Sequence, residues 1–431
     1  MKSLLPSVRV TRYNKQSVAA RIRRRPKISK SEAITRRIIA EVRRKGDRAV
    51  LEFTRKYDGV SLGKGQLKIS QAEIKETMRR VDPSVLSALR FSLQRLGVVQ
   101  KELLSRISCS TQVDGFALQL AANPLPSVGC YIPGGKAAYP STVLMTAGVA
   151  KLAGVPRIAV CTPPDSNGVV NDAVLAAADL CGVDEVYRCG GAQAIAALAY
   201  GTKTVPRVEK IVGPGGTYVQ IAKKLVSGDL PIDFYAGPTE LIVVADKAAD
   251  TRLAAWDLIA QAEHSPDTLP CLVTWSDEVA ANVRKEITRI LPRIERRKYV
   301  EESLANGLAA ICEDHETACD FVNEMAPEHV ELLTEYDRGF SKRIRAAGLI
   351  LLGPYSPAAA SDYCVGTNHV LPTGGSARNH SGLSVLDFMK LAWIVTGSQN
   401  GLQNILEPLK ILASSEGLLN HYFSVQARFE K

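Results

Sequence analysis

Histidine is scarce in this chain, and several of its six copies stand beside other polar side chains that could share a chemical task. Gln261 and His264 end a helical run that Asp250 is suited to cap. Because residues three apart share one helix face, an amide oxygen and an imidazole would project side by side. These donors suit Zn²⁺, although a histidine at a helix end is more often a capping or surface residue. Asp362 and His421 are candidates to complete the metal shell, but sequence spacing does not show whether they meet it.

A carboxylate and an imidazole adjoin at Glu328 and His329, directly before an apolar run. Neighbouring residues of a regular strand point to opposite faces, but a turn after Pro327 can direct both toward one cavity. The two groups would then supply two bases of different strength, one to take a proton from an alcohol and one to activate water. The competing interpretation is a surface glutamate beside a half-buried histidine at the start of a strand.

The segment 353–375, GPYSPAAASDYCVGTNHVLPTGG, has little helix or strand propensity and concentrates Gly, Pro, Ser, Asp, Asn and His. Long irregular loops are uncommon in compact domains unless they are functional, so we predict a site loop that contains Asp362 and His369. Cys364 lies in the same loop without an acidic or basic partner at a motif-like spacing. We therefore do not predict a thiol nucleophile.

Three glycine-rich turns indicate a place for a nucleotide. They are Ile132-Pro133-Gly134-Gly135, Cys189-Gly190-Gly191-Ala192-Gln193 and Gly213-Pro214-Gly215-Gly216. Backbone N–H groups at helix starts can hold phosphates. None of the three matches the G-x-G-x-x-G fingerprint of dinucleotide-binding domains, so tight strand–helix turns without a ligand are a serious alternative.

The elements that must position these residues alternate between strands and helices. This alternation predicts an α/β fold with parallel sheets, in a chain of 431 residues that is long enough for two or more domains. Pro and Gly cluster near 126–135 and 227–238, which predicts that the segment between them is a compact unit inserted into a first domain. From about residue 380 the pattern is mostly helical, with no strand signal. Strands are predicted at 157–162, 184–189, 208–213, 240–246, 270–275, 307–312, 329–334 and 348–353.

The formal net charge of +10 is concentrated at the N-terminus. Residues 1–50 hold 16 Lys and Arg against 3 Asp and Glu, whereas the rest of the chain carries a net charge of −3. A nucleic-acid-binding arm, a transit peptide and a solvated basic segment are the three interpretations. We favour the solvated segment because a helical pattern runs from Ser29 to Arg44, directly after the arginines.

The remaining composition is that of an ordinary soluble globular protein rather than a membrane or disulfide-rich protein. No run of 18 apolar residues predicts a membrane span, and the N-terminus lacks the apolar region of a secretory signal. The nine cysteines are scattered without a C-x-x-C pair, which is typical of reduced thiols in a reducing compartment.

Taken together, these motifs resemble the histidinol dehydrogenase family from about residue 26 to the C-terminus, in the family's order. The later Glu416 and His421 also fit. The matching stretches are EVRRKGDRAVLEFTRKYDG (41–59), YIPGGKAAYPSTVLMTA (131–147), CGGAQAIAALAYGT (189–202), DFYAGPTELIVVAD (233–246), QAEHSPD (261–267), APEHVELLT (326–334), SPAAASDYCVGTNHVLPTGG (356–375) and SGLSVLDFMK (381–390).

The resemblance implies a cytoplasmic enzyme of histidine biosynthesis that oxidises L-histidinol to L-histidine through an aldehyde, with Zn²⁺ and NAD. His329 resembles the general base, and Glu328 resembles the group that activates water. The other roles implied are zinc ligands at Gln261, His264, Asp362 and His421, further substrate contacts at Thr239, His369 and Glu416, and NAD contacts at Tyr131, Gln193 and Gly216. The four zinc ligands and Glu328 are also expected to contact the substrate.

The resemblance also implies a homodimer in which the C-terminal tail carries Glu416 and His421 into the partner's site, and two Rossmann-like domains without the usual fingerprint. We predict a basic arm at 1–27, a first domain at 28–128 and 238–378, a second, NAD-side domain at 129–237, and a helical tail at 379–431. Two positions depart from the family. Gly216 stands where Asn is common, and Thr239 stands where Ser is frequent.

Three other functions are compatible with parts of the sequence. A relative that oxidises another polar alcohol, such as a sulfonated diol, would share all of these candidate metal, catalytic and NAD-binding residues. A zinc hydrolase could use the same residue types but would act without NAD. A nucleic-acid-binding protein would depend on the basic arm and bind with strong salt dependence; we expect neither nucleic acid nor a membrane as a partner.

Overall fold

The computed structural model describes residues 4–22, 29–107, 109–134, 138–183 and 185–430, and its strands form three sheets. The largest sheet is entirely parallel and has the order β1-β10-β9-β8-β11-β12. Most of its strands are continuous apolar runs because helices cover both of its faces. The strands are β1 (Ser7–Val10), β8 (Glu240–Ala245), β9 (Leu269–Thr274), β10 (Leu308–Cys312), β11 (His329–Leu333) and β12 (Leu349–Leu352).

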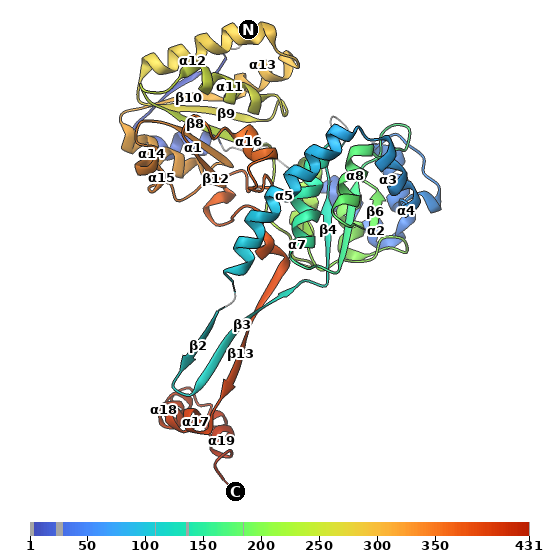
Figure 1. Cartoon of the computed structure of the whole chain (residues 1–431), viewed down its shortest axis with the longest axis vertical. Helices are drawn as coiled ribbons and strands as arrows, with labels where there is room; N and C mark the ends of the chain where they lie inside the picture. The colour runs from blue at the N-terminus through green and yellow to red at the C-terminus, as the bar shows by residue number, and fades with distance from the viewer. Residues whose placement is uncertain (1–3, 23–28, 108, 135–137, 184, 431) are drawn as a thin grey trace.

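Seven helices surround this sheet and form with it the six-stranded lobe (Figure 1). The amino-terminal ends of several of these helices are capped by the side chain of the preceding residue. The Asp250 side chain, for example, accepts a hydrogen bond from the Arg252 N–H as predicted. The helices are α1 (Lys15–Ile22), α11 (Thr251–Ala262), α12 (Asp277–Ile290), α13 (Arg297–Asn306), α14 (His315–Met325), α15 (Asp337–Ser341) and α16 (Ala358–Tyr363).

A second parallel sheet has four strands in the order β6-β5-β4-β7, and we call it with its helices the four-stranded lobe. Its strands are β4 (Ser127–Tyr131), β5 (Arg157–Thr162), β6 (Glu185–Arg188) and β7 (Ile211–Val212). Its helices are α2 (Ser29–Lys45), α3 (Asp47–Tyr57), α4 (Gln71–Arg80), α5 (Pro83–Ser105), α6 (Pro140–Val143), α7 (Val149–Leu152), α8 (Asp172–Leu180), α9 (Gly191–Tyr200) and α10 (Thr217–Val226).

The third sheet is antiparallel and extends away from both lobes, with the C-terminal helices at its far end (Figure 1). We call this extension, from residue 389 onward together with β2 and β3, the tail. It comprises β2 (Ser110–Val113), β3 (Phe116–Pro124), β13 (Met389–Gly397), α17 (Gln399–Asn404), α18 (Leu406–Ser415) and α19 (Asn420–Gln426).

The predicted α/β class with parallel sheets is confirmed, and each predicted strand overlaps an observed one. The predicted strand at 208–213 is reduced to the two residues of β7. The expectation of a tail without strands was wrong, because Met389–Gly397 forms β13 along the whole length of β3. That pairing joins segments far apart in sequence, so it cannot be predicted from a local sequence pattern.

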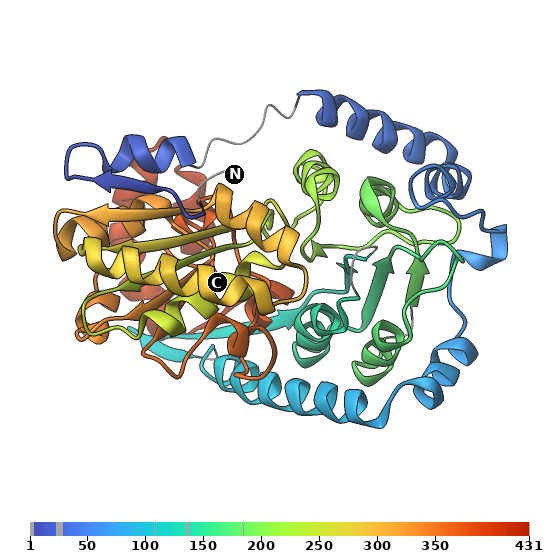
Figure 2. The same ribbon diagram turned by 90° about the horizontal axis from the view of Figure 1, so that it is seen from above.

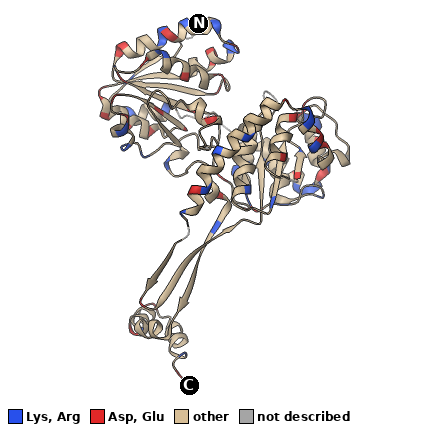
Figure 3. Cartoon of the chain, in the orientation of Figure 1, with Lys and Arg blue, Asp and Glu red and all other residues tan. Residues whose placement is uncertain are grey.

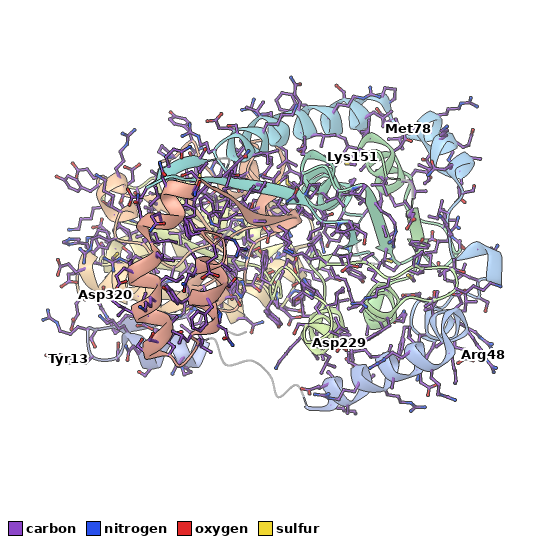
Figure 4. The ribbon with its side chains drawn as sticks, turned by 90° about the horizontal axis from the view of Figure 1, so that it is seen from below. Tyr13, Arg48, Met78, Lys151, Asp229 and Asp320 are labelled. Carbon is purple, nitrogen blue, oxygen red and sulfur yellow. The ribbon has the colours of Figure 1, made fainter. Side chains whose placement is uncertain are left out.

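The N-terminal basic segment is divided between the two lobes (Figure 2). Strand β1 adds to the edge of the six-stranded sheet and α1 packs against α14, where Lys15 forms an ion pair with Asp320. Figure 4 places Tyr13 and Asp320 on one lobe and Arg48 on the other. Helices α2 to α5 contact the four-stranded lobe, whereas the predicted domain bounds grouped 28–128 with 238–378. Those bounds stay a prediction.

Charged residues are spread along the elements of both lobes, while the tail carries few (Figure 3). Within the described residues, no helix is both long enough and apolar enough to span a membrane.

A fully buried ion pair fixes the glycine turn that follows β7. Lys223 of α10 contacts the Asp233 carboxylate, and both side chains are completely shielded from solvent. Lys223 also donates to the Gly213 carbonyl oxygen at 2.8 Å, and Asp233 accepts from the Gly213 N–H at 2.8 Å. Gly213 has a φ of +117°, and a Cβ there would lie 2.2 Å from the Tyr131 carbonyl oxygen, so only glycine fits this turn.

We expect Lys223→Met to lower the free energy of unfolding by about 3–5 kcal/mol, because it leaves the Asp233 carboxylate buried without a counter-charge. Denaturant-induced unfolding measures the loss. Lys224→Met, at the adjacent exposed lysine of the same helix, is the matched control and should change stability little. A loss below about 1 kcal/mol for Lys223→Met would show that the pair does not hold the turn.

Candidate active site

The predicted acid–imidazole pair lies at the amino-terminal ends of two neighbouring strands. Thr239 directly precedes β8, Glu328 precedes β11, and His329 is the first residue of β11. Helix α14 ends at Met325, and the next residue, Ala326, has a positive φ of 46° that reverses the chain before Pro327. This turn buries both side chains, with Glu328 at 6% exposure and His329 at 2%. The alternative of a surface glutamate is therefore wrong.

Hydrogen bonds fix the Glu328 carboxylate from the direction of β8. Its Oε2 accepts the Glu240 N–H at 2.9 Å and the Thr239 hydroxyl. Gln261 Nε2 in turn donates to Thr239 Oγ1 at 2.6 Å. Since the amide nitrogen is used in this way, the amide oxygen of Gln261 is the atom left to act as a ligand.

His329 is held between two carboxylates. Its Nδ1 lies 3.7 Å from Glu328 Oε2, and its Nε2 lies 3.6 Å from Asp362 Oδ1. Nδ1 also lies 3.4 Å from the Glu240 carbonyl oxygen. Nε2 is buried without a hydrogen-bond partner among the described residues. The imidazole therefore lies between two carboxylates, with its Nε2 directed toward Asp362.

Burial and the neighbouring charges shift the pKa values of Glu328, His329 and Asp362 in opposite directions. Burial raises the pKa of Glu328 to about 7, although His329 and the two hydrogen-bond donors oppose the rise. Burial alone would lower the pKa of His329, but the Glu328 and Asp362 carboxylates outweigh it and raise that pKa to about 9. Asp362 has a lowered pKa despite its burial, because His329 and two other histidines face it. It therefore remains ionised at neutral pH.

The site loop brings Asp362 and His369 to the boundary between the lobes. Asp362 is on α16, and its carbonyl oxygen lies 2.7 Å from His369 Nδ1. His369 Nε2 lies 3.3 Å from the Thr142 hydroxyl of the four-stranded lobe. Asn368 of the same loop donates to the Met145 carbonyl oxygen at 2.7 Å. The predicted loop is thus partly helical, and it connects the two lobes.

His264 follows α11 and is exposed to a cavity of about 500 Å³ between the lobes. Helix α5 and residues 138–141 form the opposite wall, with Tyr363 and Cys364 on the side of the six-stranded lobe. Burial lowers the pKa of His264, and the nearby Asp362 carboxylate opposes that shift only in part. Three of the four predicted metal ligands, namely Gln261, His264 and Asp362, therefore surround one region.

The fourth predicted ligand does not reach that region within the same chain. His421 is exposed on α19, and Glu416 is exposed after α18, both at the far end of the tail (Figure 1). Among the described residues of one chain, no group of three or more His, Cys, Asp and Glu side chains is arranged to hold a metal.

The predicted NAD contacts lie in the four-stranded lobe, at the carboxyl ends of its strands. Tyr131 ends β4, and its hydroxyl accepts the Gly191 N–H at 3.0 Å. Gln193 is buried in α9, and its Nε2 has no partner among the described residues. Gly216 caps α10, which follows β7. β4 and β7 are neighbouring strands, and the chain continues from β4 toward one edge of the sheet but from β7 toward the other. In open parallel sheets, ligands bind at such a switch point, at the carboxyl ends of the strands. Gly135 of the first glycine turn lies outside the described residues.

A larger cavity, of about 600 Å³, opens at the carboxyl ends of β8, β9 and β11. None of the predicted site residues lines it, and the acid–imidazole pair lies at the other ends of these strands. The buried polar network therefore identifies the chemistry better than cavity size does.

Sequence reasoning missed three residues that the structure brings to the site, namely Thr142, Asp257 and Glu331. Thr142 reaches His369, and Glu331 is a buried carboxyl group close to the Asp257 carboxyl. The available signal for Glu331 was a charged residue inside the apolar run HVELL.

Comparisons with known proteins agree on one family. The sequence profile described as histidinol dehydrogenase matches residues 21–429. Histidinol dehydrogenase from a Synechococcus strain is 43% identical over 398 residues, which is 92% of each chain. The Gluconobacter oxydans histidinol dehydrogenase is 44% identical and also covers 92% of each chain. The crystal structure of histidinol dehydrogenase from Elizabethkingia anophelis superposes with a TM-score of 0.91 at 30% identity, over 99% of this chain and 98% of that one.

The pKa of His329 should depend on the neighbouring carboxylate. Glu328→Gln removes a negative charge that stabilises the protonated imidazole, so we expect the pKa of His329 to fall below about 9. Histidine titration by NMR in the metal-free protein measures this shift, and the exposed His315 serves as an internal control. An unchanged or higher pKa would mean that Glu328 does not interact with His329 as the geometry indicates.

Proposed function

The chain belongs to the histidinol dehydrogenase family, and from this premise we propose that it oxidises L-histidinol to L-histidine with NAD, through L-histidinaldehyde. The observation that carries the proposal is the buried Glu328–His329 pair beside Asp362, because an alcohol oxidation followed by an aldehyde oxidation needs two separate proton acceptors. The setting we propose is the cytoplasm, and the nine cysteines, all free, fit a reducing compartment.

Both oxidations can be written with the residues of this cluster. In the first, His329 takes the hydroxyl proton in its neutral form, which is the minor form below its pKa of about 9, while a bound NAD would accept a hydride from the carbinol carbon, and the aldehyde remains. In the second, Glu328 takes a proton from water as its oxygen adds to the aldehyde carbon, and the hydrated carbon gives a hydride to a second NAD. The raised pKa of Glu328, about 7, suits a carboxylate that must accept a proton near neutral pH.

Zinc would be held by Gln261, His264 and Asp362 of one chain and by His421 of a partner. The donor types support this, because two imidazoles with carboxylate and amide oxygens form a set that zinc accepts. The free amide oxygen of Gln261 and the ionised Asp362 fit the role. When bound, the ion would orient the imidazole and amino nitrogens of the substrate. Thr239, His369 and Glu416 are proposed as further substrate contacts.

NAD is proposed to bind at the switch point of the four-stranded lobe, so that each lobe is Rossmann-like but without the usual glycine fingerprint. Tyr131 and Gln193 line this place, and Gly216 precedes the first turn of α10. The buried Gln193 Nε2 supports the assignment, because an unpaired buried donor is costly unless a ligand supplies the acceptor.

A homodimer would complete each site. The tail carries few charged residues (Figure 3), and several of its apolar side chains are exposed, which supports burial against a second copy of the chain. The same tail carries Glu416 and His421, so dimerisation would deliver both residues to the partner's site. The exposed apolar residues of the tail include Leu391, Trp393, Ile394, Val395, Ile411, Leu412, Leu418 and Phe423.

The stoichiometry of the reaction tests the proposed function. We expect two NADH for each L-histidinol consumed, measured by absorbance with limiting substrate. Removal of the metal with a chelator should abolish turnover and added Zn²⁺ should restore it. Absence of turnover with L-histidinol would contradict the proposal and favour a related dehydrogenase for another polar alcohol, such as a sulfonated diol.

The unusual glycine of the cofactor turn gives a second prediction. Gly216 has an ordinary φ of −66°, and no heavy atom lies within 4 Å of an added Cβ, so Asn fits without strain. Gly216→Asn should lower the KM for NAD by roughly 2–10-fold, the worth of one added hydrogen bond. Initial rates at varied NAD measure the change.

Gly228→Asn is the matched control for this experiment, because Gly228 is also open to solvent and lacks a positive φ. We expect it to leave the KM for NAD unaltered. An equal or higher KM in Gly216→Asn would place the cofactor elsewhere.

A further inference from the structure

A buried carboxyl group lies directly behind the acid–imidazole pair. Glu331 is two residues after His329 in β11, so both side chains leave the same face of the sheet. Glu331 is 2% exposed, although it stands in an otherwise apolar strand. A carboxyl group is rarely buried so fully without partners, and its partners therefore indicate its role.

The first partner of Glu331 is the amino-terminal end of α16. Oε1 of Glu331 accepts a hydrogen bond from the Ala358 N–H, the first residue of that helix. The preceding residue is Pro357, which has no side chain that could cap the helix. Glu331 therefore supplies from another strand the cap that the local sequence lacks. Asp362 follows Ala358 by one helical turn, so the capped end also sets the position of Asp362.

The second partner is a carboxyl group on α11. Asp257 lies within hydrogen-bonding reach of Glu331. Asp257 precedes Gln261 by four residues and therefore shares its helix face. No N–H or O–H group of the other described residues donates to the buried Oε2 of Glu331, so the two carboxyl groups can only bond through a shared proton.

The charges around the pair favour one shared proton. Burial raises the pKa of Glu331 to about 9, with a further rise from the adjacent Asp257, while His329 opposes it. Burial also raises the pKa of Asp257. Two carboxylates this close in a buried place cannot both ionise, so the pair holds one proton at neutral pH.

We propose that Glu331 and Asp257 are positioning residues that share one proton and tie α11 and α16 to β11. These three elements carry Gln261, Asp362 and His329, so the pair would fix the spacing of two zinc ligands and the general base. The zinc part of this inference rests on the proposed function. The proposed connection of α11 and α16 to β11 rests on the contacts alone.

Two substitutions, Glu331→Gln and Glu331→Leu, distinguish a residue that positions α11 and α16 through hydrogen bonds from one that only fills space. The glutamine keeps the acceptor for Ala358 and offers an N–H to Asp257, so it mimics the neutral acid. The leucine fills similar space without either bond. Glu335→Leu, at an exposed glutamate after the same strand, is the matched control. Circular dichroism first establishes that each purified full-length variant is folded.

Zinc affinity is measured by competition with a chelator. We expect Glu331→Leu to bind zinc about 10–100-fold more weakly, as is usual when a group that orients a ligand is lost. Glu331→Gln should stay within about threefold of the unsubstituted protein, as should Glu335→Leu. Zinc binding by Glu331→Leu at full affinity would overturn the proposal, and so would equal losses in the leucine and glutamine variants.

Hydrogen exchange in the zinc-free protein tests the tie independently of the metal. The amides of α16 should exchange at least about tenfold faster in Glu331→Leu and be unchanged in Glu331→Gln. If the unsubstituted protein binds no zinc, the proposed function fails, yet this measurement still decides the role of Glu331. Unchanged protection of α16 in Glu331→Leu would refute that role.

Discussion

The burial of Glu328 and His329 side by side is the constraint on which the rest of the site depends. Neither group is stable alone in an apolar interior, because an isolated buried charge is costly. Each is therefore surrounded by groups that compensate it, with Thr239 and the Glu240 N–H on the carboxylate and Asp362 on the imidazole. Two of these compensating groups, Thr239 and Asp362, are also a proposed substrate contact and a proposed metal ligand. One electrostatic requirement thus organises both stability and chemistry.

The strand ends explain how so many polar groups can be buried together. β8 and β11 are neighbours in the six-stranded sheet, and the N–H of Glu240, the first residue of β8, binds the Glu328 carboxylate at the start of β11. Helix α11 returns from the carboxyl end of β8 and delivers Gln261 to the same place. The four-stranded lobe closes the site through Thr142 and Met145, which hold the loop that follows α16. A substrate between the lobes would therefore contact residues from both.

Much of this arrangement could be predicted from local sequence. The cap at Asp250, the helix that ends before His264, and the apolar strand after Glu328 all depend on neighbours within a few residues, which the sequence displays directly. Interactions between distant segments could not be predicted in this way. The β3–β13 pairing, the Lys223–Asp233 pair and the Glu331 cap on α16 each join residues whose proximity only the folded chain creates. The resemblance to a family supplied the expected position of His421, which one chain alone leaves exposed on α19.

The most direct test of a site shared between two chains is complementation between two inactive variants. His329→Ala lacks the base in its own lobe, and His421→Ala lacks the ligand in its tail. If the tails exchange, unfolding and refolding the two variants together should restore about a quarter of the unsubstituted activity, because half of the randomly formed dimers are mixed and each of these has one complete site. If the mixture stays as inactive as its two components although mixed dimers form, His421 does not act across the dimer and the proposed site is wrong.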